Sequence, residues 1–412
     1  MLNKDQEREL VYVVHIDEIK PIEGADRVEQ AIVGGWHIMV RKNQFQVGDG
    51  AIYFEIDSQV PETEPFAFLA PKHYKVKTQK YFKGTVISQG LLMSAEDFGW
   101  ELCGEDPVFG VCIKDSDGVY HYENDESRFL TKQLNVKYAV VEDNVRKAHS
   151  VDKYKKMAQH HGKLFAHQPF RWLMKREWGK KALFVIFGRK EYKRSGWPAW
   201  VKKTDEERVQ NMPWILENKE PWIATEKIDG TSTTFTMKRK KSLIGQSYEF
   251  YVCSRNVVFD KPDKNCFYDT NVYMEMAQKY NIEEKMKHLL FDVFTDCEWI
   301  TIQGETYGPG IQKRDYHAPD HSFMAFNFIT SKEGRYNTVK MRELLEYNEG
   351  IPCVPIIDDH FILPDTVDEL LEIATDESVL DTGMREGLVF RSQDGAQSFK
   401  AVSNEFLLKY HA

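Results

Sequence analysis

Short apolar runs separated by glycine turns fill the first 60 residues, and this pattern does most to narrow the fold. Residues 10–16 form a run of β-branched and aromatic side chains, and comparable runs follow at 28–33, 36–40 and 51–56. Strands of this length, joined by tight glycine turns, are typical of a small β-barrel. Residues 84–93 are also apolar and are expected to add one more strand.

The second half of the chain mixes helix and strand patterns. Helices are predicted at 269–280, 338–347 and 366–373, and strands at 232–237, 249–253, 288–294, 299–302, 323–329 and 387–391. One helix has a clear start, because Thr366 and Glu369 form the capping-box pattern. The mixture predicts an α+β fold in which sheets are covered by a few helices.

Three regions are expected along the chain. They are a small barrel over 1–145, a basic linker over 146–195 that includes a helix at 151–160, and an α+β domain over 196–412. Between 175 and 203, lysines and arginines alternate with aromatic residues. Such a segment either holds phosphates while its rings stack on bases, or is a solvated linker whose rings pack on a neighbouring domain.

The composition excludes several classes of protein. No stretch approaches about 20 apolar residues, the length of a membrane span, and the charged start of the chain shows no signal peptide. The six cysteines form no C-x-x-C pair, so a zinc site or a disulfide framework is not expected. A net charge of −9 argues against a protein that simply coats nucleic acid. A cytoplasmic location is expected, in the host cytoplasm if the protein is viral.

The segment that offers the most chemistry is Glu226-Lys227-Ile228-Asp229-Gly230, in which a lysine stands between two carboxylates. A lysine amine attacks phosphorus only when neutral, and a free lysine is protonated at pH 7. A nearby cation or burial must therefore favour the neutral form. The glycine lets the backbone turn sharply and approach a ligand. The alternative is a surface turn that carries a salt-bridged lysine.

Four further candidates follow in order along the chain. Glu305 is expected in a glycine-rich turn after a strand, where a carboxylate can accept from ribose hydroxyls or hold a metal-bound water. Phe326 is a candidate to stack on a purine, with core packing as the alternative. Glu386 begins an apolar strand and suits a metal or metal-water ligand. Lys400 offers an ammonium that would stabilise charge at a transferred phosphate.

With these residues in this order, the chain resembles the covalent nucleotidyltransferases, the superfamily of polynucleotide ligases and RNA capping enzymes. More narrowly, it resembles the Naegleria-type ATP-dependent RNA ligases, which carry an N-terminal OB domain. Three more segments carry this match, at 45–58, 87–91 and 203–211. The resemblance implies an OB-like nucleic-acid-binding barrel, followed by a nucleotidyltransferase domain of antiparallel sheets with flanking helices.

The resemblance also implies catalytic and metal-binding roles. Lys227 would become linked to AMP, and Lys400 would contact the α-phosphate. Asp229 would hold a metal-bound water or the ribose edge. Glu386 would hold the metal through water.

Nucleotide-binding residues follow from the same resemblance. Glu226 would contact adenine, largely through its backbone, and Phe326 would stack on it. Arg255 and Glu305 would bind the ribose, and Lys400 the phosphate.

Two positions depart from the family pattern. The last motif of the family often has two lysines separated by one residue, whereas Lys400-Ala401-Val402 has one, so which of the two Lys400 represents stays open. Asn327 stands where many superfamily members have aspartate. Neither departure removes the nucleophile.

An ATP-dependent RNA ligase active in RNA repair is the leading interpretation. ATP would supply AMP, Mg²⁺ or Mn²⁺ would be the metal, and the partner would be RNA with 3′-hydroxyl and 5′-phosphate ends. A monomer without membrane contact is expected. The alternatives are a DNA ligase or capping-type nucleotidyltransferase, in which the OB domain usually comes last, and a non-catalytic OB-type RNA-binding module.

Overall fold

The protein is described from a computed structural model, over residues 1–139, 167–187, 197–203, 205–241, 245–259 and 271–411. The chain divides into two compact units, one made of Met1–Tyr138 and Ser195–Ala412 and the other of Ala139–Arg194. The predicted domain boundaries near residues 145 and 195 stay a prediction, because this grouping keeps the barrel and the larger domain in one unit.

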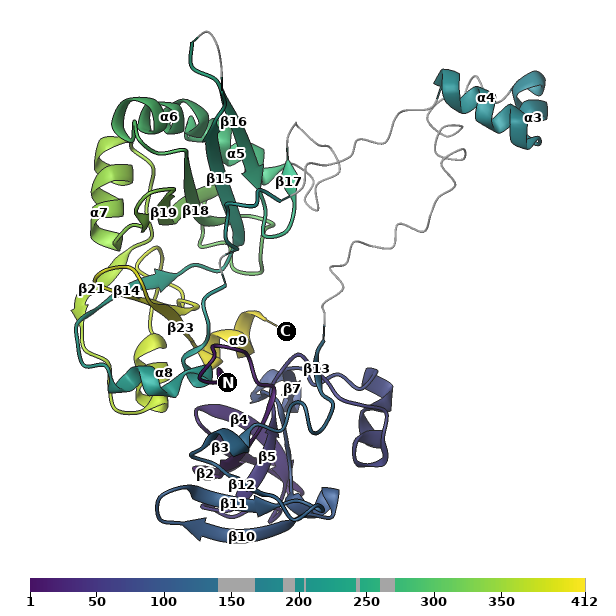
Figure 1. The fold of residues 1–412 in the computed structure, drawn as a ribbon, viewed down its shortest axis with the longest axis vertical. Helices are drawn as coiled ribbons and strands as arrows, with labels where there is room; N and C mark the ends of the chain where they lie inside the picture. The colour runs from purple at the N-terminus through teal and green to yellow at the C-terminus, as the bar shows by residue number, and fades with distance from the viewer. Residues whose placement is uncertain (140–166, 188–196, 204, 242–244, 260–270, 412) are drawn as a thin grey trace. The chain divides into compact units, whose positions relative to one another are not determined.

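Small antiparallel sheets make up the N-terminal part of the first unit (Figure 1). The three-stranded sheets are β1 (Val11–His15), β5 (Gly50–Phe54) and β9 (Leu91–Met93), then β2 (Glu18–Pro21), β3 (Val28–Val33) and β4 (Trp36–Arg41), then β10 (Glu101–Asp106), β11 (Gly110–Lys114) and β12 (Tyr120–Tyr122). Two short pairs join β6 (Ser58–Gln59) to β13 (Lys137–Tyr138), and β7 (Gln79–Tyr81) to β8 (Val86–Ser88). These strands confirm the short-strand pattern predicted for the first 60 residues.

Both faces of β1 and β5 are buried up to the exposed His15 at the end of β1, which explains why the other residues of these strands are apolar. Val13 pairs with Ile52 and lies in one hydrophobic cluster. Tyr12 pairs with Tyr53 and lies in the other, with ring centroids 5.4 Å apart. Because side chains alternate along a strand, a strand with a core on each face needs no polar positions.

The strand predicted over 84–93 is interrupted. β8 ends at Ser88 and β9 begins at Leu91, because Gly90 lies between them with φ +109°. A Cβ at Gly90 would approach the Tyr53 ring to 2.5 Å, so the close approach itself requires glycine.

Two helices form the described part of the second unit, where a basic linker was predicted. They are α3 (Gln168–Met174) and α4 (Glu177–Phe187). Trp172 and Trp178 meet edge to face, and the Arg176 guanidinium lies 3.8 Å from the centroid of a Trp172 ring. The helix predicted at 151–160 lies outside the described residues.

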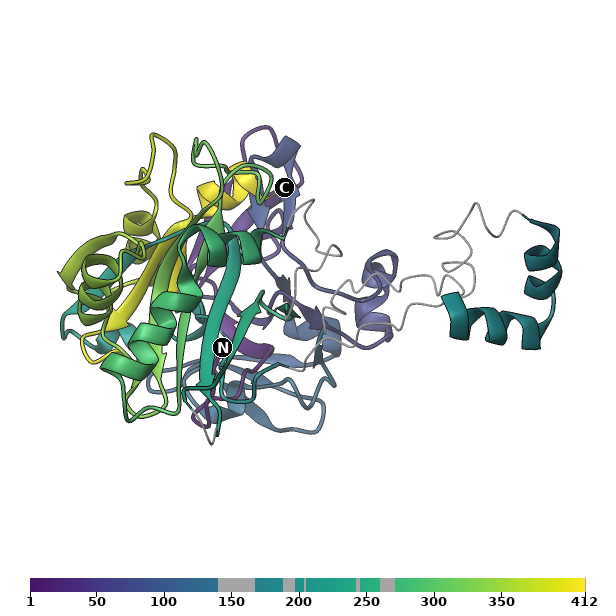
Figure 2. The ribbon, with the colours of Figure 1, turned by 90° about the horizontal axis from the view of Figure 1, so that it is seen from above.

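A six-stranded antiparallel sheet is the larger half of the C-terminal domain (Figure 1). Its order is β17 (Val258–Phe259), β16 (Tyr248–Cys253), β15 (Thr231–Arg239), β18 (Trp299–Tyr307), β19 (Ser322–Thr330) and β20 (Gly334–Arg335). Helices α5 (Val272–Lys279), α6 (Ile282–His288) and α7 (Thr338–Arg342) share one hydrophobic cluster with it. Figures 1 and 2 show the ribbons of these helices beside the sheet. This large core fixes the sheet on which half of the site is built.

A four-stranded antiparallel sheet forms the other half, in the order β21 (Ile356–Phe361), β14 (Trp222–Lys227), β22 (Gly387–Ser392) and β23 (Ser398–Val402). Helix α8 (Val367–Ala374) shares its hydrophobic cluster, and its capping box between Thr366 and Glu369 is present as predicted. The chain then passes from β23 into α9 (Asn404–Tyr410). The predicted α+β class, with antiparallel sheets and flanking helices, is confirmed.

One predicted strand is wrong. Residues 288–294 continue helix α6 as a π-helical turn, Leu289–Val293. The buried residues Ile282, Met286, Leu289 and Leu290 follow a spacing of four, seven and eight, which is the pattern of a helix face. A longer window would have favoured a helix over a strand. The helix predicted at 338–347 is likewise α-helical only to Arg342 and continues as a π-helical turn, Glu343–Asn348.

The other strands predicted in this half are confirmed within β15, β16, β18, β19 and β22. Glu305 was predicted in a turn, and this prediction is wrong. The residue lies inside β18 and pairs with Ser232 on the neighbouring strand β15. Within the described residues, no helix is long and apolar enough to span a membrane.

Candidate active site

A single cavity of about 420 Å³ contains all eight candidate residues. They are Glu226, Lys227, Asp229, Arg255, Glu305, Phe326, Glu386 and Lys400. The two sheets of the C-terminal domain supply them jointly. The ordered motifs, which span more than half of this domain's sequence, therefore converge on one place.

Strand register explains the convergence on the four-stranded sheet. Lys227, the last residue of β14, pairs with Gly387, so the preceding Glu386 comes beside it. Val389 pairs in turn with Lys400 on β23. Three neighbouring strands thus bring two lysines and one glutamate to the same wall of the cavity.

Gly230 is required by a close approach between the two sheets. A Cβ at this position would collide with the Thr306 backbone oxygen on β18. The turn after Lys227 therefore passes directly against the strand that carries Glu305. The glycine of the motif brings the two halves of the site together.

Lys227 and Glu386 form the central ion pair. Lys227 Nζ donates a hydrogen bond of 2.6 Å to Glu386 Oε2. Burial by itself would lower the pKa of Lys227, but the negative charges of Glu386 and Glu305 outweigh burial and raise it above the usual lysine value. In this state the amine is protonated and does not act as a nucleophile.

The side chain of Glu226 serves a loop and not the open cavity. Its carboxylate accepts hydrogen bonds from Ser378 Oγ at 2.6 Å and from the Val379 backbone N–H at 2.9 Å. The residue is 1% exposed, and burial raises its pKa despite these bonds. The Glu226 carboxylate is therefore engaged with this loop, and the contact of its backbone with adenine stays a prediction.

Asp229 is held by two residues that the sequence did not indicate. Its backbone N–H donates to Tyr316 Oη at 2.6 Å. His411, which follows α9, places Nε2 3.2 Å from Asp229 Oδ1. The second carboxylate oxygen, Oδ2, is buried and has no hydrogen-bond partner among the described residues.

Lys400 lies in an unusually cationic part of the cavity. Burial, followed by the charges of Lys227 and Arg208, lowers the pKa of Lys400 to about 8. The Lys400 backbone N–H donates to Glu207 O at 2.8 Å, which places Arg208 alongside β23. Arg208 also lines the cavity, and its buried Nη1 has no hydrogen-bond partner within the described part of the chain.

Sequence reasoning gave Arg208 no role, although it lies in the 203–211 segment that carried part of the resemblance. Its guanidinium carbon lies 5.6 Å from the centroid of the Trp36 ring on β4. Burial lowers the pKa of Arg208. A buried cation with an unused donor beside Lys400 suits a phosphate oxygen.

The six-stranded sheet contributes a more open wall. Arg255 follows β16, and its Nη2 pairs with Asp205 Oδ2 at 2.6 Å on the exposed rim. Glu305 lies deeper. Burial, with the negative charges of Glu386 and Asp229, raises the pKa of Glu305 to about 8, although Lys227 opposes this shift.

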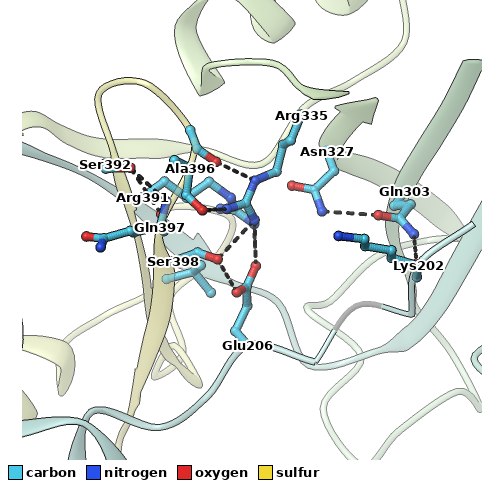
Figure 3. A network of polar contacts seen from close by, with 12 residues as sticks. Lys202, Glu206, Gln303, Asn327, Arg335, Arg391, Ser392, Ala396, Gln397 and Ser398 are labelled. Carbon is cyan, nitrogen blue, oxygen red and sulfur yellow. Dashed lines mark hydrogen bonds and ion pairs between the residues drawn. The ribbon is translucent and has the colours of Figure 1, made fainter. Parts of the chain in front are cut away.

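At the wall of the cavity, Glu206 connects three strands of the two sheets (Figure 3). Glu206 Oε1 lies 3.4 Å from Arg391 Nη2 and 3.4 Å from Arg335 Nη1, and Ser398 donates to its other oxygen. Arg391 is 2% exposed. Its guanidinium carbon lies 5.9 Å from the centroid of the Phe326 ring. The Glu206 network therefore fixes the Arg391 guanidinium, which lies under the Phe326 ring.

Asn327, which stands where many members of the superfamily have aspartate, follows Phe326 and lies in the same region (Figure 3). Its Nδ2 donates to Gln303 Oε1 at 3.2 Å, and Gln303 Nε2 donates to Lys202 O at 2.9 Å. A neutral amide serves this chain of bonds, because it donates where an ionised aspartate could only accept.

Two parts of the chain match models of known families. Residues 220–411 match the family model for RNA ligase, and residues 10–95 match a model for an OB-fold domain. No curated protein matches the sequence.

Solved structures of an RNA ligase from Naegleria gruberi share the fold over nearly the whole chain. The complex with pyrophosphate is 24% identical, with a TM-score of 0.59, and the match covers 98% of this chain and 99% of that one. A mutant of the same ligase with AMP and Mn is 24% identical at a TM-score of 0.61, with the same coverage. Residues 220–411 therefore resemble the RNA ligase family, and residues 10–95, which resemble an OB-fold domain, precede that region.

Proposed function

We propose that this protein is an ATP-dependent RNA ligase that joins a 3′-hydroxyl end to a 5′-phosphate end. The observation that carries the proposal is the convergence of Lys227, Glu386 and Lys400 in one cavity. An amine, a carboxylate that accepts its proton and a second ammonium suit phosphoryl transfer to nitrogen. The family match over residues 220–411 supports the same reaction.

The reaction has three steps in this proposal. Lys227 Nζ, after losing a proton, attacks the α-phosphorus of ATP, and the bond to pyrophosphate breaks. An oxygen of the RNA 5′-phosphate then attacks the phosphorus of the lysine-bound AMP, and the P–N bond breaks. Finally the 3′-hydroxyl attacks the 5′-phosphate, the strand is sealed and AMP leaves. Glu386 Oε2, which already accepts the hydrogen bond from Lys227, is placed to receive the first proton.

Two further cations that line the cavity would stabilise the charge that develops. Lys400 would contact the α-phosphate. Arg208 would bind a further phosphate oxygen through Nη1, which has no hydrogen-bond partner among the described residues. When Lys400 is positive it also disfavours the protonated form of Lys227.

The remaining candidates would hold the nucleoside. Phe326, over the buried Arg391, would stack on adenine, and Glu226 would contact the base through its backbone. Arg255 and Glu305 would bind the ribose hydroxyls. The structures of the Naegleria ligase with ATP or AMP support a nucleotide of this kind.

The acidic residues also fit a divalent cation, Mg²⁺ or Mn²⁺. Asp229 and Glu386 are hard oxygen donors, and Asp229 Oδ2 is buried with no partner among the described residues. When bound, the cation would neutralise charge on the phosphates. The Naegleria structures contain Mn with ATP or AMP.

The alternative interpretations explain less. DNA ligases and capping enzymes usually carry their OB domain last, whereas the OB match here comes first. A binding module would not need the nucleophile, the acids and Lys400 in one cavity. The OB domain would position RNA. The monomeric state and the cytoplasmic location stay predictions.

The proposal is tested with purified full-length protein, ATP and Mg²⁺ or Mn²⁺, offered matched RNA and DNA ends. Nicked duplexes, gapped duplexes and single strands are compared, each with and without a 5′-phosphate. Sealing of RNA ends that requires ATP and the 5′-phosphate is expected. Failure on every RNA substrate, or equal sealing of all-DNA ends, contradicts the proposal.

A further inference from the structure

The turn that follows helix α9 brings a histidine into the site although no motif contains it. The His411 backbone N–H donates to Leu407 O, and Lys80 Nζ on β7 donates to Leu408 O at 2.7 Å. The last turn of α9 is therefore bound from the N-terminal domain as well as from its own helix. These two hydrogen bonds, one from each domain, hold His411 next to Asp229.

His411 completes a cluster of three metal-ligating side chains. One ligand atom from each of Asp229, Glu386 and His411 lies within 4.8 Å of the other two. In an octahedral site with bonds of about 2.1 Å, opposite ligand atoms are about 4.2 Å apart. Small side-chain rotations would therefore place all three around one ion.

Two independent observations favour a cation at this cluster. Asp229 is 5% exposed, and its Oδ2 has no hydrogen-bond partner in the described part of the chain. Glu386 is 7% exposed, and the cation hydrogen-bonded to it is the ammonium of Lys227, which must be released and deprotonated before it can react. A divalent cation would supply the missing charge and take the place of that ammonium.

We propose that His411 is a direct ligand of a divalent cation that is also held by Asp229 and Glu386, and that its nitrogen makes the site prefer Mn²⁺ over Mg²⁺. Mg²⁺ takes oxygen ligands and keeps much of its water. Transition-metal ions accept imidazole more readily. This inference rests on the proposed function, because it names the metal of that site.

A simpler role for His411 would be an ion pair with Asp229, 3.2 Å away, with no metal contact. The two roles differ in whether a His411 ring nitrogen binds the metal when the metal is present. A ligand nitrogen couples magnetically to bound Mn²⁺, whereas a paired imidazolium does not.

The test measures Mn²⁺ binding to the full-length protein without ATP or RNA. Pulsed electron paramagnetic resonance detects coupling between the metal and ¹⁴N, and a titration gives the affinities for Mn²⁺ and Mg²⁺. The variants are His411→Ala, which removes the ligand, and His411→Gln, which offers an amide oxygen at similar reach. His360→Ala is the matched control, because His360 pairs with Asp359 at an exposed position on β21.

The parent and His360→Ala are expected to show ¹⁴N coupling, and His411→Ala and His411→Gln to lack it. His411→Ala should weaken Mn²⁺ binding by about tenfold or more. His411→Gln should narrow the preference for Mn²⁺ over Mg²⁺. Bound Mn²⁺ without ¹⁴N coupling in the parent, or unchanged affinity in folded His411→Ala, overturns the inference. Because the measurement needs no ATP, failure of the ligase proposal would appear separately, as absent AMP transfer with ¹⁴N coupling intact.

Discussion

Lys227 and Glu386 are joined by a 2.6 Å hydrogen bond between neighbouring strands, so the proposed nucleophile is held as an ammonium before any ligand arrives. The pair explains how a lysine remains fixed in the cavity, and also why it is unreactive there. Activation requires that another cation replace the Lys227 ammonium beside Glu386, and that Lys227 lose its proton. ATP phosphates, a divalent metal and Lys400 are the groups that would do this.

Lys400→Met should lower AMP transfer to the protein by about 10²–10³, the usual effect of losing one positioned donor at a developing charge. The melting temperature should not fall, because burial already lowers the pKa of Lys400 and makes its positive charge unfavourable in the fold. Label transfer from ATP and thermal melts check both expectations.

Lys287→Met is the matched control for this change, because Lys287 is a partly exposed lysine on α6 that does not line the cavity. Lys287→Met should change neither the rate of AMP transfer nor the melting temperature. A Lys400→Met protein that unfolds, or that keeps a rate within a few-fold of the parent, would assign Lys400 a structural role.

Glu305→Gln should change how stability depends on pH. The pKa of Glu305 is about 8 in the fold and 4.5 for the free group, so the folded protein holds a proton that the unfolded chain releases between these values. The free energy of unfolding contributed by Glu305 therefore falls as the pH rises from about 4.5 to 8. Gln cannot ionise, so the variant should lose this slope and be more stable than the parent at pH 8.

Urea unfolding of the metal-free parent and Glu305→Gln at pH 5 and pH 8 measures the difference. The two proteins should be close at pH 5 and separate at pH 8. An identical pH dependence for both would show that Glu305 is ionised in the fold over this range.

Glu206→Gln should destabilise the protein by about 1.5–3 kcal/mol, the range for hydrogen bonds to charged groups. The substitution removes the negative charge shared by Arg391 and Arg335 (Figure 3), and Arg391 is too buried to regain water. Denaturant unfolding checks this value. Glu220→Gln, at an exposed position, should be neutral. A similarly small effect at Glu206 would mean that the arginines do not depend on it.

Local pattern was sufficient for much of the fold and for the residues within motifs. Alternation and β-branched runs identified most strands, and Thr366 with Glu369 identified the start of α8. The prediction for 288–294 failed because a short segment with five apolar residues fits a strand. Only the spacing of buried residues from Ile282 onward distinguishes the helix face. Glu305 was expected in a turn because the flanking glycines suggested one, whereas pairing with β15 extends the strand.

The residues that were missed are those that reach the site through tertiary contacts. Tyr316 meets a backbone amide of the motif, and His411 follows a short helix near the end of the chain. Neither is part of a repeated spacing, so nothing local marks them. Arg208 was within a segment that resembled the family, but its role depends on the packing of that segment along β23.

The central claim is that Lys227 becomes covalently linked to AMP. The most direct measurement is incubation of the full-length protein with α-labelled or γ-labelled ATP and a divalent metal, followed by denaturing electrophoresis and peptide mapping. Label from α-labelled ATP alone should appear on the peptide that contains Lys227. Lys227→Ala should lose it, and so should Lys227→Arg, because a guanidinium stays protonated and cannot attack. Label that persists in a folded Lys227→Ala protein, or that maps to another residue, would contradict the account.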